Sequence, residues 1–125
     1  MLLEDISAYL EQQGLGTVGV DIYRGDMPDA PDECIALYEQ PGQAPEQNWD
    51  AERPGLTVRV RSVDRGDAAS RAYAVWKALN GLTNAALNGT EYHRIDASSS
   101  IAQAGRDGKR RHYYICNFSV IKEVE

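Results

Sequence analysis

The sequence predicts an α+β domain in which two helices pack on one face of a mostly antiparallel sheet of about five strands. Two observations predict this class: apolar residues recur at helical spacing in two segments, and strand-like patterns recur in five others. The length of 125 residues fits one domain, residues 1–125. The expected order is one helix, three strands, a second helix and two further strands.

The chain begins with a segment of helical periodicity. Leu3, Ile6 and Leu10 repeat at the spacing of one helix face, which predicts a helix over residues 2–13. The stretch that follows, TVGVDIY, is rich in β-branched residues and predicts a strand over residues 17–23. The first two elements are therefore a helix and a strand.

A loop, a second strand and a long irregular stretch come next. Residues 25–33 predict a loop, because their two prolines and four acids fit neither periodicity. Residues 34–39 are almost entirely apolar and predict a strand near the centre of the sheet. Residues 40–55 hold three prolines and two glycines, and a loop of this length is usually functional or mobile. Trp49 in this stretch either folds back onto the core or anchors a neighbouring subunit.

The third expected strand, residues 56–61, alternates strictly between apolar and polar side chains. Val58 and Val60 lie on one face, and Arg59 and Arg61 lie on the other. Such alternation predicts a sheet that is covered on one side only. We expect the two arginines to serve assembly rather than folding; the alternatives are that they are solvated or are covered by a helix of the same chain.

The second helix is expected over Asp67–Leu79, with Asp67 as its N-cap and Gly81 as its stop. Its apolar stripe consists of Ala68, Ala72, Val75, Trp76 and Leu79. This pattern predicts that Trp76 lies in the core and that its removal destabilises the subunit.

Two strands complete the expected sheet. Residues 90–97 and 111–123 both read as strands, and they are expected to pair antiparallel across a connection that turns at Asp107-Gly108. That connection carries four cations: Arg106, Lys109, Arg110 and Arg111. Because the whole chain has a net charge of -6, we favour a salt-sensitive protein contact over nucleic acid at this basic loop.

The charge is divided along the chain. Residues 1–55 carry 12 acids and 2 bases, a net of -10, whereas residues 56–125 carry 7 acids and 11 bases, a net of +4. One interpretation is that both sets are solvated faces. The other is a subunit with an acidic and a basic side, whose copies pack head to tail and close into a ring.

No pattern for catalysis, metal or cofactor emerges from the residues. Cys34 and Cys116 lie in apolar runs, where free buried thiols are expected, and neither forms a close ligand pair with His93 or His112. The acids between residues 26 and 33 lack the spacing of a calcium-binding loop. No export signal or membrane span is expected from the apolar runs.

Two stretches, LYEQPGQAPEQNWDAERPGLTVRVRS and GRDGKRRHYYICNFSV, resemble the tail-terminator (minor capsid) proteins of long-tailed bacteriophages. The motifs that carry the resemblance are, in order, Tyr38-Glu39, Pro41-Gly42, Arg53-Pro54-Gly55, the alternating strand from Leu56 to Arg61, the helix from Asp67 to Leu79, Gly105-Arg106-Asp107 and Asn117-Phe118. They span nearly the whole chain. One departure is the GKRR that follows Asp107, which makes this loop unusually basic.

The resemblance implies a structural virion protein that forms a ring, typically a hexamer, on the head-proximal end of the tail tube. Such a ring stops tube polymerisation and offers a surface for the head. Implied partners are further copies, the major tail tube protein and head–tail connector proteins, with DNA only as passing cargo and no membrane; the implied places are the virion and, during assembly, the host cytoplasm. No catalysis and no cofactor are implied.

The candidate subunit or tube contacts are Trp49, Arg53, Arg59, Arg61, Arg106, Lys109, Arg110 and Arg111. Two other functions stay open at this point. One is a head-completion or neck protein that docks on the connector. The other, less favoured, is a small hydrolase that uses the acids between residues 26 and 33.

Overall fold

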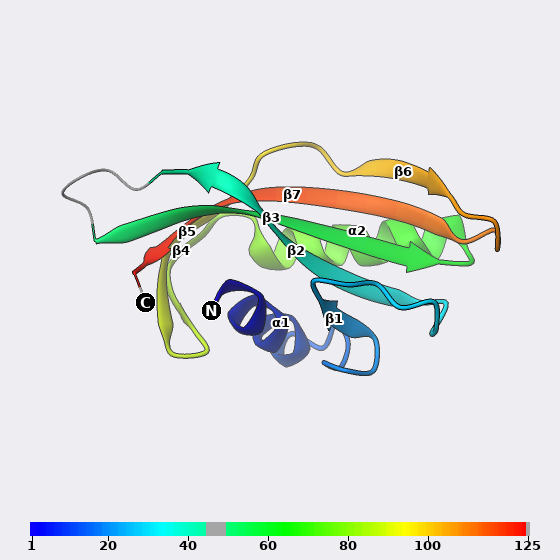
Figure 1. Cartoon of the computed structure of the whole chain (residues 1–125), viewed down its shortest axis with the longest axis horizontal. Helices are drawn as coiled ribbons and strands as arrows, with labels where there is room; N and C mark the ends of the chain where they lie inside the picture. The colour runs from blue at the N-terminus through cyan, green and yellow to red at the C-terminus, as the bar shows by residue number, and fades with distance from the viewer. Residues whose placement is uncertain (45–49, 125) are drawn as a thin grey trace.

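The computed structural model describes residues 1–44 and 50–124 (Figure 1). Within them the elements follow in the order α1 (Leu2–Gln12), β1 (Ile22–Arg24), β2 (Cys34–Gln43), β3 (Ala51–Ser62), α2 (Arg65–Leu79), β4 (Leu82–Leu87), β5 (Thr90–Ala97), β6 (Ala102–Arg106) and β7 (His112–Glu123). The α+β class is confirmed, with seven strands in place of the five expected. Trp49 lies outside the described residues.

The strands form one sheet in the order β1-β2-β3-β7-β5-β4, and β6 also pairs with β7. All pairs are antiparallel except β1 with β2. The expected pairing of residues 90–97 with 111–123 is confirmed as β5 with β7. The long strand β7 therefore has β3 along one edge, and its other edge is shared between β5 and β6 (Figure 1).

Both helices contribute to one apolar cluster on one face of the sheet. From α1 it contains Ile6 and Leu10, both fully buried, as the helical spacing predicts. The sheet side of the cluster includes Leu56, Val58, Val60, Cys116, Phe118 and Val120. The alternation in β3 thus identified its core face correctly. Within residues 1–44 and 50–124, no helix lies on the opposite face of β3 and β7.

Two expectations for the first half of the chain are wrong. The strand expected at residues 17–23 is reduced to the short β1, because the carbonyl of Thr17 accepts hydrogen bonds from the N–H groups of three residues that follow it and closes a turn. Residues 40–55 are not one irregular stretch: β2 continues to Gln43 and β3 begins at Ala51. The two strands form a hairpin that projects from the body of the molecule (Figure 1).

A single glycine allows this hairpin to form. The register of β2 against β3 shifts between Gln40 and Gln43. At Gly42 a Cβ atom would lie 1.8 Å from the carbonyl oxygen of Arg53. Only glycine fits such a close backbone approach. We refer to residues 40–55 as the hairpin arm.

The sequence interpretation missed β4 and β6. Strand β4 forms a hairpin with β5 through Asn88 and Gly89, which both have positive φ, as a tight turn between antiparallel strands requires. Strand β6 is exposed along its whole length and offers no alternation that would reveal it. Both are edge segments, where packing leaves little pattern in the sequence.

Helix α2 agrees with its expected span, but its cap does not. Asp64, rather than Asp67, is the N-cap, and its carboxylate accepts the N–H of Asp67 at 3.1 Å. The stripe residues Ala72 and Val75 are fully buried. Trp76 packs against the core cluster but stays half-buried, so its assignment to the core is correct only in part.

Candidate functional site

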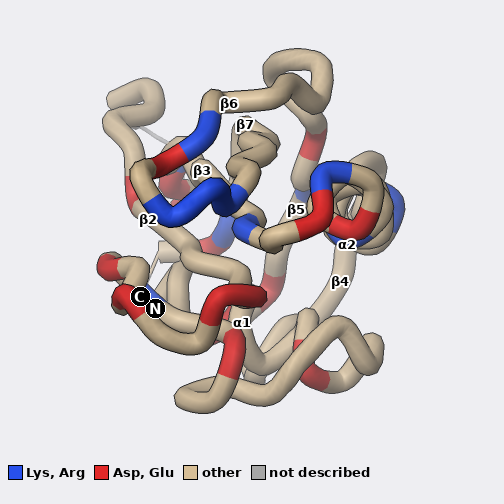
Figure 2. The backbone as a smooth tube through the Cα atoms, turned by 90° about the vertical axis from the view of Figure 1, so that its right-hand side faces the viewer, with Lys and Arg blue, Asp and Glu red and all other residues tan. Residues whose placement is uncertain are grey.

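The charged residues singled out in the sequence gather where the β6–β7 turn meets residues 25–33, here named the acidic loop. Lys and Arg are concentrated at the β6–β7 turn, while the α1 side of the molecule carries mainly Asp and Glu (Figure 2). The acidic first half and the basic second half of the sequence are therefore in contact at this place within one chain. This contact changes the interpretation of several arginines.

Arg61 is buried, with 2% of its surface exposed, and is not a solvent-facing residue. Its Nε donates to the carbonyl oxygen of Asp32 at 3.0 Å, and its Nη2 donates to those of Pro28 and Pro31, both at 2.6 Å. The structure contradicts the expectation that Arg61 is available for assembly, because the acidic loop folds over this end of the helix-free face and accepts the hydrogen bonds of its guanidinium.

Arg111 binds the same loop from the neighbouring strand. Its side chain is 5% exposed and forms ion pairs with Asp107 at 2.7 Å, Asp29 at 2.9 Å and Asp32 at 3.5 Å. Lys109 also pairs with Asp29. The hydrogen bonds from Lys109 and Arg111 hold the pKa of Asp29 below its ordinary value. Lys109 and Arg111 therefore have partners within the chain.

Asp107 organises the β6–β7 turn. Its Oδ1 accepts the backbone N–H groups of Lys109 and Arg111, both at 3.0 Å, and its Oδ2 accepts the Nε–H of Arg111 and the hydroxyl of Tyr113. The hydrogen bond from the Arg111 side chain holds the pKa of Asp107 well below its usual range. The turn and the acidic loop are thus joined by one network of charged hydrogen bonds.

Sequence reasoning missed Asp29, Asp32 and Asp107 as partners of these cations. The signal was present in the opposite charge of the runs 26–33 and 106–111. This signal predicts a contact only when the order of the strands is known. Strand β3 lies between β2 and β7, and this order brings the start of β2 close to the start of β7.

The remaining predicted contact residues are more accessible. Arg106 and Arg110 are exposed and make no side-chain ion pair among the described residues; Arg110 adopts a φ of 63°. Arg59 is half-buried on the helix-free face, 4.9 Å from the centre of the Tyr113 ring. Arg53 lies in the hairpin arm and donates to Gln43 Oε1 at 3.1 Å. These four arginines stay candidates for contacts with other subunits.

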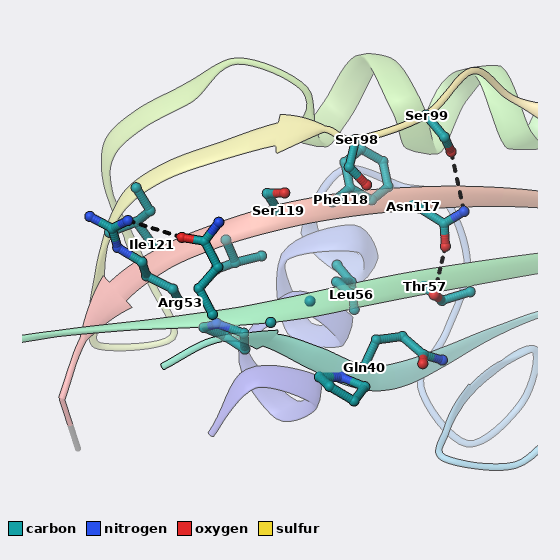
Figure 3. A pocket seen from close by; sticks show the side chains of 16 residues that line it. Gln40, Arg53, Leu56, Thr57, Ser98, Ser99, Asn117, Phe118, Ser119 and Ile121 are labelled. Carbon is teal, nitrogen blue, oxygen red and sulfur yellow. Dashed lines mark hydrogen bonds between the residues drawn. The ribbon is translucent and has the colours of Figure 1, made fainter. Parts of the chain in front are cut away.

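A groove of about 460 Å³ lies on the helix-free face at the base of the hairpin arm (Figure 3). Thr57 donates to Asn117 Oδ1 at 2.7 Å, and Asn117 Nδ2 donates to Ser99 at 3.2 Å, so a chain of hydrogen bonds crosses it. Its lining combines small and amide or hydroxyl side chains with Leu56 and Phe118.

Clusters of metal-ligating side chains and membrane-spanning helices are both absent from the described residues. Over residues 1–44 and 50–124, no three His, Cys, Asp or Glu side chains are close enough to hold a metal ion. No helix in the same ranges is long and apolar enough to cross a membrane.

Both cysteines are free and buried. Burial raises the pKa of Cys34, and it raises the pKa of Cys116 to about 11. Since the thiolate is the reactive form, we expect alkylation by iodoacetamide at pH 7.5 to be far slower in the native protein than in urea. Quantitative mass spectrometry checks this; equal rates in the two states would contradict the burial.

One protein family and several solved structures resemble this chain. A family model described as "Bacteriophage tail terminator protein" matches residues 9–124. A solved chain from the "Virion of native gene transfer agent (GTA) particle" superposes with a TM-score of 0.68 at 16% identity, covering 95% of this chain and 94% of that one. A second solved chain, without a descriptive name, has a TM-score of 0.55 at 12% identity and covers 99% and 92%. No curated protein matches the sequence.

Proposed function

Because this chain belongs to the bacteriophage tail terminator family, we propose that it forms a ring that caps the head-proximal end of a phage tail tube. In this role it stops tube polymerisation and presents a surface for joining the head. Its partners are then further copies of itself, the major tail tube protein and the connector proteins, while DNA passes through without specific binding. The protein resides in the virion after assembly in the host cytoplasm.

The observation that carries this proposal is the family match over residues 9–124. It covers the last four residues of α1, all of α2 and all seven strands of the described chain, so it concerns nearly the whole subunit, which we take as a single domain. The similarity in fold to a chain of a virion particle over 95% of this chain agrees with a structural role. Among the described residues, no arrangement of side chains favours the alternative of a small hydrolase.

The structure narrows the surfaces that could serve such a ring. Arg61, Lys109 and Arg111 are engaged by the acidic loop of their own chain. Arg106 and Arg110 project from the β6–β7 turn, and Arg53 lies on the hairpin arm. We propose the exposed Arg106 and Arg110, with the half-buried Arg53 and Arg59, as the cationic contacts of the assembly.

Negative-stain electron microscopy of the purified protein with isolated tail tubes tests the function. We expect rings, and tubes that carry one ring at one end and no longer grow. Rings bound to connectors instead would favour a neck protein, and the persistence of monomers at high concentration and low salt would contradict the proposal. A variant with Arg106→Ser and Arg110→Ser is expected to fold normally and to assemble only at lower salt.

A further inference from the structure

A hollow of about 470 Å³ lies between α2 and the connection from β5 to β6. Two aromatic side chains of α2 line it, and the opposite wall consists of residues 97–101. Tyr73 is 55% exposed, and Trp76 is half-buried. Large exposed aromatic rings are unusual on a surface that stays in water and are frequent in protein interfaces. We refer to this hollow as the aromatic groove.

The aromatic groove continues over the edge of the sheet. Ser98 and Ser99 line it and also line the groove on the helix-free face. They lie in the connection between the end of β5 and the start of β6. This connection runs along the edge of β7 with which both strands pair. A peptide crossing this edge would meet the hydroxyls of Ser98 and Ser99 on its way to the rings of Tyr73 and Trp76.

The hairpin arm supplies a segment that matches this path. Strands β2 and β3 extend away from the body of the molecule as far as Gln43 and Ala51, the described ends of the arm (Figure 1). By sequence, the end of the arm contains Trp49 with Glu46 and Asp50 close by. The side chain of Lys77 lies one turn after that of Tyr73 on the same face of α2 and is exposed, which complements these acids in charge.

We propose that the aromatic groove receives the hairpin arm of a second copy of this chain, with Trp49 against the rings of Tyr73 and Trp76. Arm and groove are different patches, so the contact is heterologous and each subunit both gives and accepts an arm. Repetition of such a contact closes into a ring when the rotation permits. The inference deepens the proposed function by naming one contact on which the ring depends.

Photo-crosslinking in assembled protein tests this contact. Benzoylphenylalanine replaces Tyr73, and a mixture of nitrogen-15-labelled and unlabelled subunits reveals which crosslinks join two copies. We expect mixed-isotope crosslinks that fragment-ion sequencing locates at residues 45–49, within the tryptic peptide of residues 25–59. The same probe in place of Glu11, an exposed residue of α1, serves as the control and should give no mixed-isotope crosslinks to residues 45–49.

A pair of substitutions gives an independent readout. Tyr73→Ser is expected to keep the melting temperature of the monomer and to raise the protein concentration needed for half-assembly by roughly tenfold or more, the scale of losing one interface anchor. Val63→Ser removes an apolar residue of similar exposure, 51%, outside the groove and should change neither quantity.

The outcomes separate the two proposals. Rings that form normally with Tyr73→Ser, or crosslinks that never include residues 45–49, overturn the arm contact and leave the ring intact. Failure of the unsubstituted protein to form rings overturns the proposed function and, with it, this inference. Crosslinks to the arm of the same copy, recognised by the absence of mixed isotopes, also overturn it.

Discussion

Replacing Arg61 by serine is expected to destabilise the subunit by about 3 kcal/mol or more, since hydrogen bonds to a charged group contribute about 1.5–3 kcal/mol each. The guanidinium is buried and donates to four backbone carbonyls of the acidic loop. Without it, those carbonyls lose their donor, and the loop no longer covers the end of the sheet. Cys34, which pairs opposite Arg61 in the sheet, is then exposed to solvent.

Arg59→Ser is the matched control, because Arg59 lies two residues earlier on the same face of the same strand. Its side chain is half-buried, stacks on Tyr113 and makes no ion pair among the described residues. We expect a loss of less than about 1 kcal/mol, the range of an exposed cation–π contact. Urea unfolding curves of both variants provide the comparison.

The thiol of Cys34 gives a second readout of the Arg61 variant. Faster alkylation of Cys34 than of Cys116 is expected in Arg61→Ser, because only the first lies beneath the acidic loop. If Arg61→Ser unfolds at the same urea concentration as the parent and leaves Cys34 protected, then the loop does not depend on this arginine.

The two arginines of β3 show which properties of a side chain could be predicted from the sequence and which could not. Alternation along residues 56–61 correctly separates Val58 and Val60 from Arg59 and Arg61. The alternation cannot predict that residues 25–33 cover Arg61, because that contact joins positions about 30 residues apart in the chain. The alternation of a strand predicts to which face of the sheet a side chain points. Contacts with segments distant in the sequence determine whether that face is exposed to solvent.

The long elements were predictable, and the edges were not. Helix α1, helix α2 and the strands β3, β5 and β7 have strong periodicity because each packs against the core. Strands β4 and β6 lack it, and the Asn88-Gly89 turn was the one local signal for the first of them. The candidate site was predictable as a set of cations, but their division into buried and accessible members required the sheet order.

The second large effect is expected from Arg111→Met. The buried guanidinium is surrounded by the carboxylates of Asp29, Asp32 and Asp107, and its loss leaves these negative charges close together without their cation. The loss of stability at pH 7 should be smaller than that of Arg61→Ser, because Asp29 and Asp32 remain well exposed to water. Arg110→Met, at the adjacent exposed position, is the control and should be nearly neutral.

The pH dependence of Arg111→Met distinguishes lost charge pairing from lost packing. The folded pKa of Asp107 lies well below its ordinary value of 3.8, with the hydrogen bond from Arg111 as the main cause, and the pKa of Asp29 is also lowered. A lowered folded pKa contributes stability that is complete above the ordinary pKa and is lost as the pH falls toward the folded value. The parent should therefore lose stability below about pH 4 more steeply than the variant, and their unfolding free energies should converge. A difference that stays constant from pH 7 to pH 2.5 would mean that Arg111 acts through packing of its side chain and not through its charge.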